Sequence, residues 1–187
     1  MATTNNQINP VFSKWKGAIY FTSGRAGMNP EYFVIHVMDG TLQGTDQWFN
    51  NAQSHASAHS GIGSNGEVHD YVHSTDSAWH AGASTNQGAK WKGFKFAPNG
   101  KLINPNLYTL GIEHEGRPNK EITEAAYLAS AGKIKYWALR YNIPLTRDRF
   151  VAHSDIYPGH NCPNMAVNID KLFKLVLTAA PIYPETK

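Results

Sequence analysis

The chain has 187 residues, about the length of one domain, and its 41% hydrophobic, 12% aromatic and 17% charged residues exclude an intrinsically disordered chain. No apolar run approaches the ~18–20 residues that a membrane-spanning helix needs. The positive residues behind the net charge of +3 are scattered, which argues against nucleic-acid binding. A single cysteine, Cys162, excludes an internal disulfide. The nine histidines are an unusually high number, and histidine is the commonest metal ligand and acid–base residue, so their positions in the chain matter.

The first fifty residues predict an irregular arm, a strand and a short helix. Residues 1–30 mix short apolar patches with prolines and glycines, which is typical of an arm that packs on a core. Residues 32–37 (Tyr-Phe-Val-Ile-His-Val) are nearly all β-branched or aromatic and predict a buried central strand. Thr45 is a good N-cap residue, so residues 45–49 predict a short helix.

The middle of the chain predicts a hairpin, a long loop and a second core strand. An Asn-Gly pair at residues 65–66 separates two strand-like runs, which is a strong hairpin signal. Residues 73–106 are rich in serine, glycine, asparagine and histidine with aromatic residues between them, and this composition indicates a functional loop. Strand character resumes at residues 108–114.

The last third of the chain predicts two helices and one strand. Apolar residues at helical spacing predict an amphipathic helix over residues 123–140, which Pro144 ends. Residues 150–152 predict a short strand and residues 167–177 a final helix. Strands mixed with helices predict an α/β fold with a single mixed central sheet flanked by helices. The expected organisation is an N-terminal arm packed on the core (residues 1–30), one main domain (31–178) and a tail or linker stub (179–187).

Three residues at or just after predicted strand ends have the chemistry of a metal site. They are His36, His153 and Cys162. Two imidazoles and a thiolate are good zinc ligands, and three protein ligands leave a fourth position open for water. Taken one at a time, each has an ordinary explanation. His36 fits a core histidine, Cys162 fits an inert buried thiol, and His153 fits a turn or helix cap.

Five ordered motifs favour the metal site over these ordinary explanations, because together they resemble one enzyme family. The chain resembles the zinc-dependent N-acetylmuramoyl-L-alanine amidases, or type-2 amidases, which include phage endolysins, wall-recycling amidases and peptidoglycan-recognition proteins. The resemblance spans residues 31–177. The motifs are Val-Ile-His at 34–36, Ser-Ala-His at 57–59 with the hairpin at 65–71, Ala-Trp-His-Ala-Gly at 78–82, Leu-Gly-Ile-Glu-His-Glu-Gly at 110–116, and His-Ser-Asp-Ile-Tyr-Pro-Gly at 153–159 followed by Cys162.

The resemblance implies a zinc amidase of the type-2 amidase fold that cleaves the bond between N-acetylmuramic acid and L-alanine in bacterial peptidoglycan. His36, His153 and Cys162 would hold Zn²⁺. Glu113 would act as general base and then general acid, although a glutamate on a strand edge more often faces solvent or pairs with a lysine. Glu115 is the reserve candidate, because strand alternation puts it on the same face as Glu113.

Four further residues belong to the predicted site. Many family members carry a lysine two positions before the third ligand, and here His160 takes that place as the expected oxyanion helper, or else as a solvated loop residue. His59, Trp79 and His80 are expected to bind substrate or to support a ligand, although Trp79 also fits a core position. Tyr71 and Tyr157 are candidates for the tyrosine that some members place near the metal. The other four histidines carry no signal.

Two other classes of function stay open. A peptidoglycan-binding module would recognise muropeptide without cutting it, although the retained Cys162 and Glu113 favour an enzyme. A structural zinc site would need a fourth protein ligand, such as His59 or His160. We expect a monomer that binds peptidoglycan, with no nucleic-acid partner and no membrane insertion. The polar start has no signal-peptide pattern, so we expect a chain made in the cytoplasm that reaches the wall after holin-type release, or that recycles wall fragments.

Overall fold

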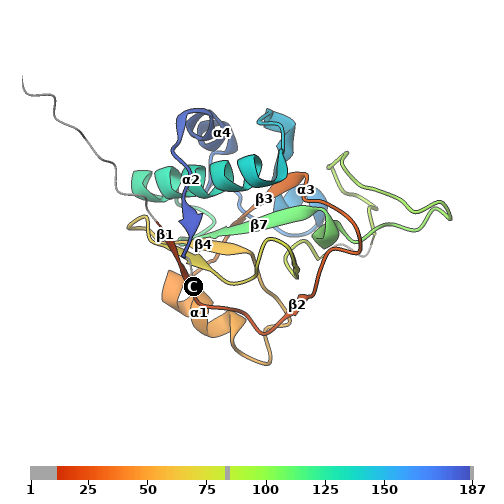
Figure 1. Ribbon diagram of the computed structural model, residues 1–187, viewed down its shortest axis with the longest axis horizontal. Coiled ribbons are helices and arrows are strands. Elements are labelled where there is room, and N and C mark those ends of the chain that lie inside the picture. The colour runs from red at the N-terminus through yellow and green to blue at the C-terminus, as the bar shows by residue number, and fades with distance from the viewer. Residues whose placement is uncertain (1–11, 83–84, 186–187) are drawn as a thin grey trace, which may run out of the picture.

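The predicted mixed sheet is present in the computed structural model, which describes residues 12–82 and 85–185 (Figure 1). Within these residues the sheet has seven strands in the order β8-β3-β7-β4-β5-β1-β9. Their bounds are β1 (Phe12–Trp15), β3 (Tyr32–Val37), β4 (Ser60–Ile62), β5 (Val68–Asp70), β7 (Thr109–His114), β8 (Phe150–Ala152) and β9 (Tyr183–Pro184). The β4–β5 hairpin is antiparallel, and β3 runs parallel to both β7 and β8. A separate antiparallel pair joins β2 (Phe21–Thr22) to β6 (Ser77–Ala78).

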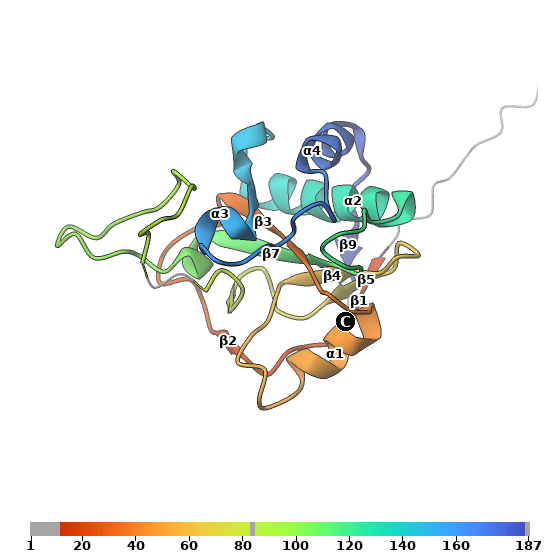
Figure 2. The same ribbon diagram turned by 180° about the vertical axis from the view of Figure 1, so that it is seen from behind.

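Helices cover both faces of this sheet. They are α1 (Leu42–Phe49), α2 (Glu124–Tyr141), α3 (His153–Ile156) and α4 (Ile169–Thr178), with short 3₁₀ turns at Pro105–Leu107 and Arg147–Arg149. Both views show α2 and α4 together on one face and α1 on the opposite face (Figures 1 and 2). None of the helices in the described ranges is both long and apolar enough to cross a membrane.

Strand alternation divides β3 and β7 between the core and a polar site. The core beneath α2 and α4 takes its strand residues from alternate positions, namely Phe33, Ile35, Val37, Leu110 and Ile112. His36 and Glu113 therefore project from the opposite face. The two residues are register partners on adjacent parallel strands, so the register of the sheet places them side by side.

Each end of the chain supplies a strand to the sheet, and neither strand was predicted from the sequence. The arm contributes β1, which pairs with β5, and the tail contributes β9, which pairs with β1. The Ile182 backbone N–H also donates to the Gly132 carbonyl at 2.9 Å. Only Ser13 of β1 is buried and β9 is exposed, so neither segment shows the apolar alternation that predicts a strand. Residues 1–11 of the predicted arm and 186–187 of the predicted tail lie outside the described residues.

The first helix begins earlier than its prediction. Thr41 is the N-cap of α1, and its Oγ1 accepts from the Gly44 backbone N–H at 3.1 Å. Thr45 lies inside the helix and donates its hydroxyl hydrogen to the Thr41 carbonyl. The helix α2 ends as predicted before Pro144, but the residue that ends it is Asn142, which adopts a left-handed conformation with φ of 52°. The short helix α3 was not expected.

Replacing Thr123 with alanine should lower the free energy of unfolding by about 1 kcal/mol, the usual cost of losing an N-cap. The Thr123 hydroxyl accepts from the Ala126 backbone N–H at 3.1 Å and donates to the Ser64 carbonyl. Thr123→Ser keeps both hydrogen bonds and is the matched control. Urea unfolding measures the difference, and equal losses in both variants would show that the hydroxyl does not stabilise α2.

Candidate functional site

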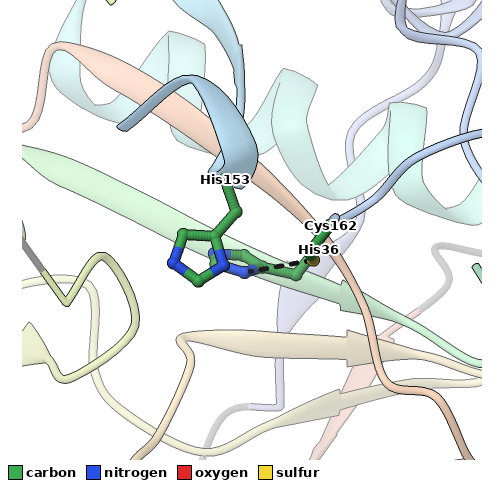
Figure 3. Close-up of side chains that lie close together, drawn as sticks. All are labelled: His36, His153 and Cys162. Atoms are coloured by element: carbon green, nitrogen blue, oxygen red, sulfur yellow. Dashed lines mark hydrogen bonds between the residues drawn. The ribbon is translucent and has the colours of Figure 1, made fainter. Parts of the chain in front are cut away.

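The three residues proposed as metal ligands converge at the carboxyl ends of neighbouring strands. His36 lies near the end of β3, His153 begins α3 directly after β8, and Cys162 lies in the loop that follows α3. One donor atom from each lies within 4.8 Å of the others. The His36 Nδ1 and Cys162 Sγ atoms are 3.9 Å apart, and Figure 3 shows the side chains gathered in one place. The sheet thus brings together residues that are 126 positions apart in sequence.

Local hydrogen bonds hold the cysteine loop against the sheet. The Ser154 backbone N–H donates to the Cys162 carbonyl at 2.7 Å, which closes the loop that begins at α3. The Val37 backbone N–H points at Cys162 Sγ at 3.3 Å. An N–H donor directed at sulfur favours the thiolate, the form that binds metals. The backbone of β3 therefore fixes His36 and the thiol of Cys162 together.

The protonation chemistry of this cluster fits a bound cation. Burial lowers the pKa of His36 well below its ordinary value and that of His153 to about 4, so both imidazoles keep free lone pairs at neutral pH. His153 Nε2 is buried and has no hydrogen-bond partner. Burial raises the pKa of Cys162 to about 12, with the charge of Glu113 adding to the effect. A cation is what would deprotonate such a thiol and satisfy the buried nitrogen.

Glu113 occupies the position expected of a general base. Its Oε1 lies 3.9 Å from His36 Nδ1, and its Oε2 is buried without a hydrogen-bond partner. Burial raises the pKa of Glu113 to about 8, which suits a group that both accepts and donates a proton near neutral pH. Glu115 is engaged elsewhere, since its carboxylate accepts from the backbone N–H groups of Leu42 and Ser64.

A pocket of about 390 Å³ opens over this cluster and contains all but one of the predicted site residues. They are His36, Trp79, His80, Glu113, His153, His160 and Cys162. His59 is not among the lining residues. It is buried behind His80, where its Nδ1 accepts from the Gly111 backbone N–H at 3.0 Å and its Nε2 lies 2.8 Å from Arg25 Nη2. Because Nδ1 accepts, the ring proton of the neutral imidazole is on Nε2, which lies 3.2 Å from the Asp76 carbonyl oxygen. The geometry therefore does not favour the expected contact of His59 with substrate, since both of its nitrogens already have partners in the protein.

The exposed ring of His160 stands at the rim of the pocket. Its centroid lies 5.1 Å from that of His153 and 4.8 Å from that of Tyr157. Of the two candidate tyrosines, Tyr157 stacks beside His153, with ring centroids 6.3 Å apart. Tyr71 is buried, and its hydroxyl donates to an Asp46 carboxylate oxygen at 2.8 Å.

Several residues that support the site could not be predicted from the motifs. Thr109 and Asn106 both contact the segment that carries His80, and His114 ties the two central strands to α2 through the His36 carbonyl (2.7 Å) and the Ser130 hydroxyl (2.8 Å). One signal was available. Thr109 and Gly111 alternate with core residues and share a strand face with Glu113, and neither a polar residue nor a glycine is usual in a buried strand.

The metal-free chain should lose stability as the pH falls from 7 to 5. Burial lowers the pKa of His114 to about 4 and that of His80 to about 3, whereas an unfolded histidine titrates near 6.5. The unfolded chain therefore binds more protons, so this stabilisation is complete above pH 6.5 and is lost toward pH 4. His114 alone should cost about 2 kcal/mol over this interval.

Urea unfolding in the presence of a chelator at pH 7 and pH 5 measures this loss. A His114→Gln variant should lose less stability over the same interval, because one titrating group is gone. An equal or larger free energy of unfolding at pH 5 would contradict the buried, neutral state of these imidazoles.

Comparisons with known proteins show which family the sequence resembles. A family model described as N-acetylmuramoyl-L-alanine amidase matches residues 26–165. The chain is 34% identical over 106 residues to 1,6-anhydro-N-acetylmuramyl-L-alanine amidase AmpD of Haemophilus influenzae, covering 57% of this chain and 50% of that protein. It is 30% identical over 104 residues to N-acetylmuramoyl-L-alanine amidase A of Achromobacter lyticus, covering 55% and 47%. The chain thus spans about half the length of these curated relatives.

Solved structures share the fold. A crystal structure of a Se-Met AmpD derivative matches with a TM-score of 0.68 at 23% identity, covering 88% of this chain and 94% of that one. A mutant endolysin from Bacillus subtilis matches with a TM-score of 0.61 at 18% identity, covering 89% and 99%. These likenesses confirm the predicted fold class. Because the family model spans most of the sequence, the chain belongs to the N-acetylmuramoyl-L-alanine amidase family.

Proposed function

We propose that the chain is a zinc-dependent amidase that cleaves the bond between N-acetylmuramic acid and L-alanine in peptidoglycan. The observation that carries this proposal is the convergence of His36, His153 and Cys162 beside Glu113 in one pocket. The names of the two curated relatives support the same bond as the point of cleavage.

The donor set favours zinc in a catalytic site. Two imidazoles and one thiolate are ligands that zinc accepts, and the metal-binding group found within residues 12–82 and 85–185 has three members. Three protein ligands leave one of four positions open, whereas structural zinc sites have four protein ligands. Bound zinc supplies Lewis acidity toward the amide carbonyl and lowers the pKa of water to ~7.

Glu113 carries the proton transfers of this mechanism. Its buried, unpartnered Oε2 accepts the proton of the attacking water, and the same oxygen returns a proton to the departing L-alanine nitrogen. Protonation of the nitrogen is required because an amide anion is a very poor leaving group. The burial that raises the pKa of Glu113 to about 8 makes the carboxylate a better acceptor for the proton of the attacking water, and the protonated carboxyl then donates to the more basic departing nitrogen.

His160 is the proposed donor to the developing oxyanion. It is exposed at the pocket rim, so its ring can turn an N–H toward a substrate carbonyl. A donor of this kind lowers the barrier by ~2.7–4 kcal/mol in other hydrolases.

An aromatic wall beside the pocket supports a sugar–peptide substrate. Trp79 is 38% exposed, lines the pocket and stacks on Tyr20 with ring centroids 5.3 Å apart. Tyr20 in turn contacts His55 at 4.8 Å. The apolar face of an aromatic side chain packs well against the apolar face of a sugar ring, and its polar edge can contact the polar groups of the sugar. We therefore assign substrate contact to Trp79, and we place the muramoyl group along this wall.

Product analysis tests this function and separates the two cellular roles. The purified, zinc-loaded chain is incubated with cell-wall peptidoglycan and, separately, with soluble 1,6-anhydromuropeptide, and mass spectrometry identifies the products. An amidase releases peptides with a free L-alanine terminus and leaves intact glycan. Wall digestion favours a lytic role, and turnover of the soluble fragment alone favours recycling. Binding to the wall without new amino termini in either substrate would support the non-catalytic alternative.

A further inference from the structure

His80 lies between a proposed metal ligand and the end of a strand, and it contacts both. Its Nδ1 is 3.2 Å from His36 Nε2, and its Nε2 is 3.2 Å from Thr109 Oγ1. The Thr109 hydroxyl is also 2.8 Å from the Pro105 carbonyl oxygen. His36, His80, Thr109 and the Pro105 carbonyl therefore form one hydrogen-bond network that runs from His36 into the protein interior.

The Pro105 carbonyl oxygen, at the far end of this hydrogen-bond network, fixes the direction of every hydrogen bond in it. A carbonyl oxygen only accepts, so the Thr109 hydroxyl donates to Pro105 and uses a lone pair to accept from His80 Nε2–H. A neutral imidazole carries one ring proton, so His80 Nδ1 has a lone pair and accepts from His36 Nε2–H. The single proton of His36 is then on Nε2, and the lone pair of Nδ1 faces Cys162 Sγ at 3.9 Å.

The His80 ring packs directly against Gly111 of β7. A Cβ atom at Gly111 would lie 2.5 Å from His80 Cγ and 2.7 Å from His80 Nδ1, so only glycine leaves room for the imidazole against β7. The Asn106 side-chain oxygen accepts from the backbone N–H groups of His80 (3.2 Å) and Ala81 (2.8 Å). A glycine in a strand interior and a buried asparagine both cost stability, and here both serve the placement of one ring.

We propose that His80 and Thr109 are positioning residues that hold His36 in the Nε2–H tautomer and so present Nδ1 to the metal. This inference rests on the metal site of the proposed function. It assigns His80 to the support of a ligand, one of the two roles open to it from the sequence, and it adds Thr109, which no motif singled out. Outer partners of metal-bound histidines fix ring orientation in this way, and their loss typically costs 10–100-fold in metal affinity.

Thr109→Val tests the hydrogen-bond network, because valine has nearly the shape of threonine but no hydroxyl. Valine cannot accept from His80 Nε2–H, so His80 is free to reverse its tautomer and place a proton on Nδ1, where it opposes His36 Nε2–H. Thr109→Ser keeps the hydroxyl and is the rescue variant. His80→Ala removes the acceptor altogether. Competition with a chromophoric chelator measures zinc affinity, and long-range ¹H–¹⁵N spectra of the metal-free chain report which nitrogen of His36 carries the proton.

We expect Thr109→Val and His80→Ala to weaken zinc binding by about 10–100-fold and Thr109→Ser to restore most of the affinity. We also expect His36 to carry its proton on Nε2 in the parent chain and to show mixed tautomers in His80→Ala. Parental zinc affinity in a folded Thr109→Val variant, or a parent His36 with its proton on Nδ1, would overturn the inference while leaving the metal site intact. Failure of the parent to bind zinc would instead contradict the proposed function itself.

Discussion

Replacing Glu113 with glutamine should lower the rate of amide hydrolysis by about 10²–10⁴-fold, the range expected for the loss of a general acid–base group. Glutamine has the shape of glutamate but cannot accept the proton of the attacking water. Glu113 is not among the three proposed metal ligands, so the variant should retain zinc and its fold. Turnover of muropeptide by the zinc-loaded variant, followed by chromatography of the released peptide, measures the effect.

Glu115→Gln is the matched control for this variant. Glu115 is two residues away in sequence, yet its carboxylate accepts hydrogen bonds from the backbone of Leu42 and Ser64 and lies outside the pocket lining. We expect a modest loss of stability and nearly parental turnover. The opposite pattern, with turnover lost in Glu115→Gln and retained in Glu113→Gln, would transfer the catalytic role to Glu115.

Replacing Cys162 with serine should abolish tight zinc binding and activity together. A thiolate is a strong zinc ligand, whereas a serine hydroxyl stays protonated near neutral pH and binds zinc poorly. The Sγ atom also receives the Val37 backbone N–H and faces His36, and the metal-binding group found among the described residues has no fourth member to replace it. The melting temperature of the parent should rise when zinc is added, because a ligand that binds only the folded state stabilises it. That of the variant should not respond.

Cys162→Asp separates a missing ligand from a damaged loop. Aspartate also coordinates zinc through oxygen, so this variant should recover part of the zinc-dependent rise in melting temperature. A Cys162→Ser chain that keeps parental zinc affinity and turnover would remove Cys162 from the ligand set.

The strongest sequence patterns predicted the fold elements that carry the site. The β-branched run of β3, the strand β8 and the helical spacing of α2 lie within one or two residues of their predicted bounds. These segments are buried against one another, so their apolar periodicity records the core directly. The hairpin was predicted equally clearly from the Asn-Gly pair at residues 65–66. Its turn requires a glycine, because Gly66 adopts a positive φ of 87°.

The edge strands could not be predicted in the same way. Strand β1 is held by buried polar contacts, among them the Lys133 ammonium, which lies 2.7 Å from an Asp70 carboxylate oxygen and 3.1 Å from the Ser13 hydroxyl. Lysine on a helix and serine on a strand carry no local signal for such a network. Their pairing exists only after the sheet and α2 have come together.

Within the candidate site, motif order predicted which side chains lie together but not their hydrogen-bond partners. His36, His153, Cys162 and Glu113 converge as the resemblance implied. His59 and His80 looked alike in sequence, yet His80 lines the pocket while His59 faces Arg25. The difference arises from the space above Gly111 and from the position of the arm, which are tertiary properties. The roles assigned to these residues, and zinc itself, stay predictions.

The number of zinc ions bound per chain tests whether His36, His153 and Cys162 form one metal site. The chain is stripped with a chelator, reloaded with zinc, freed of excess metal, and analysed by inductively coupled plasma mass spectrometry beside His36→Ala and His153→Ala variants of confirmed fold. We expect one zinc ion per parent chain and almost none in either variant. A parent chain without zinc, or variants that retain the full complement, would contradict a site built from these side chains.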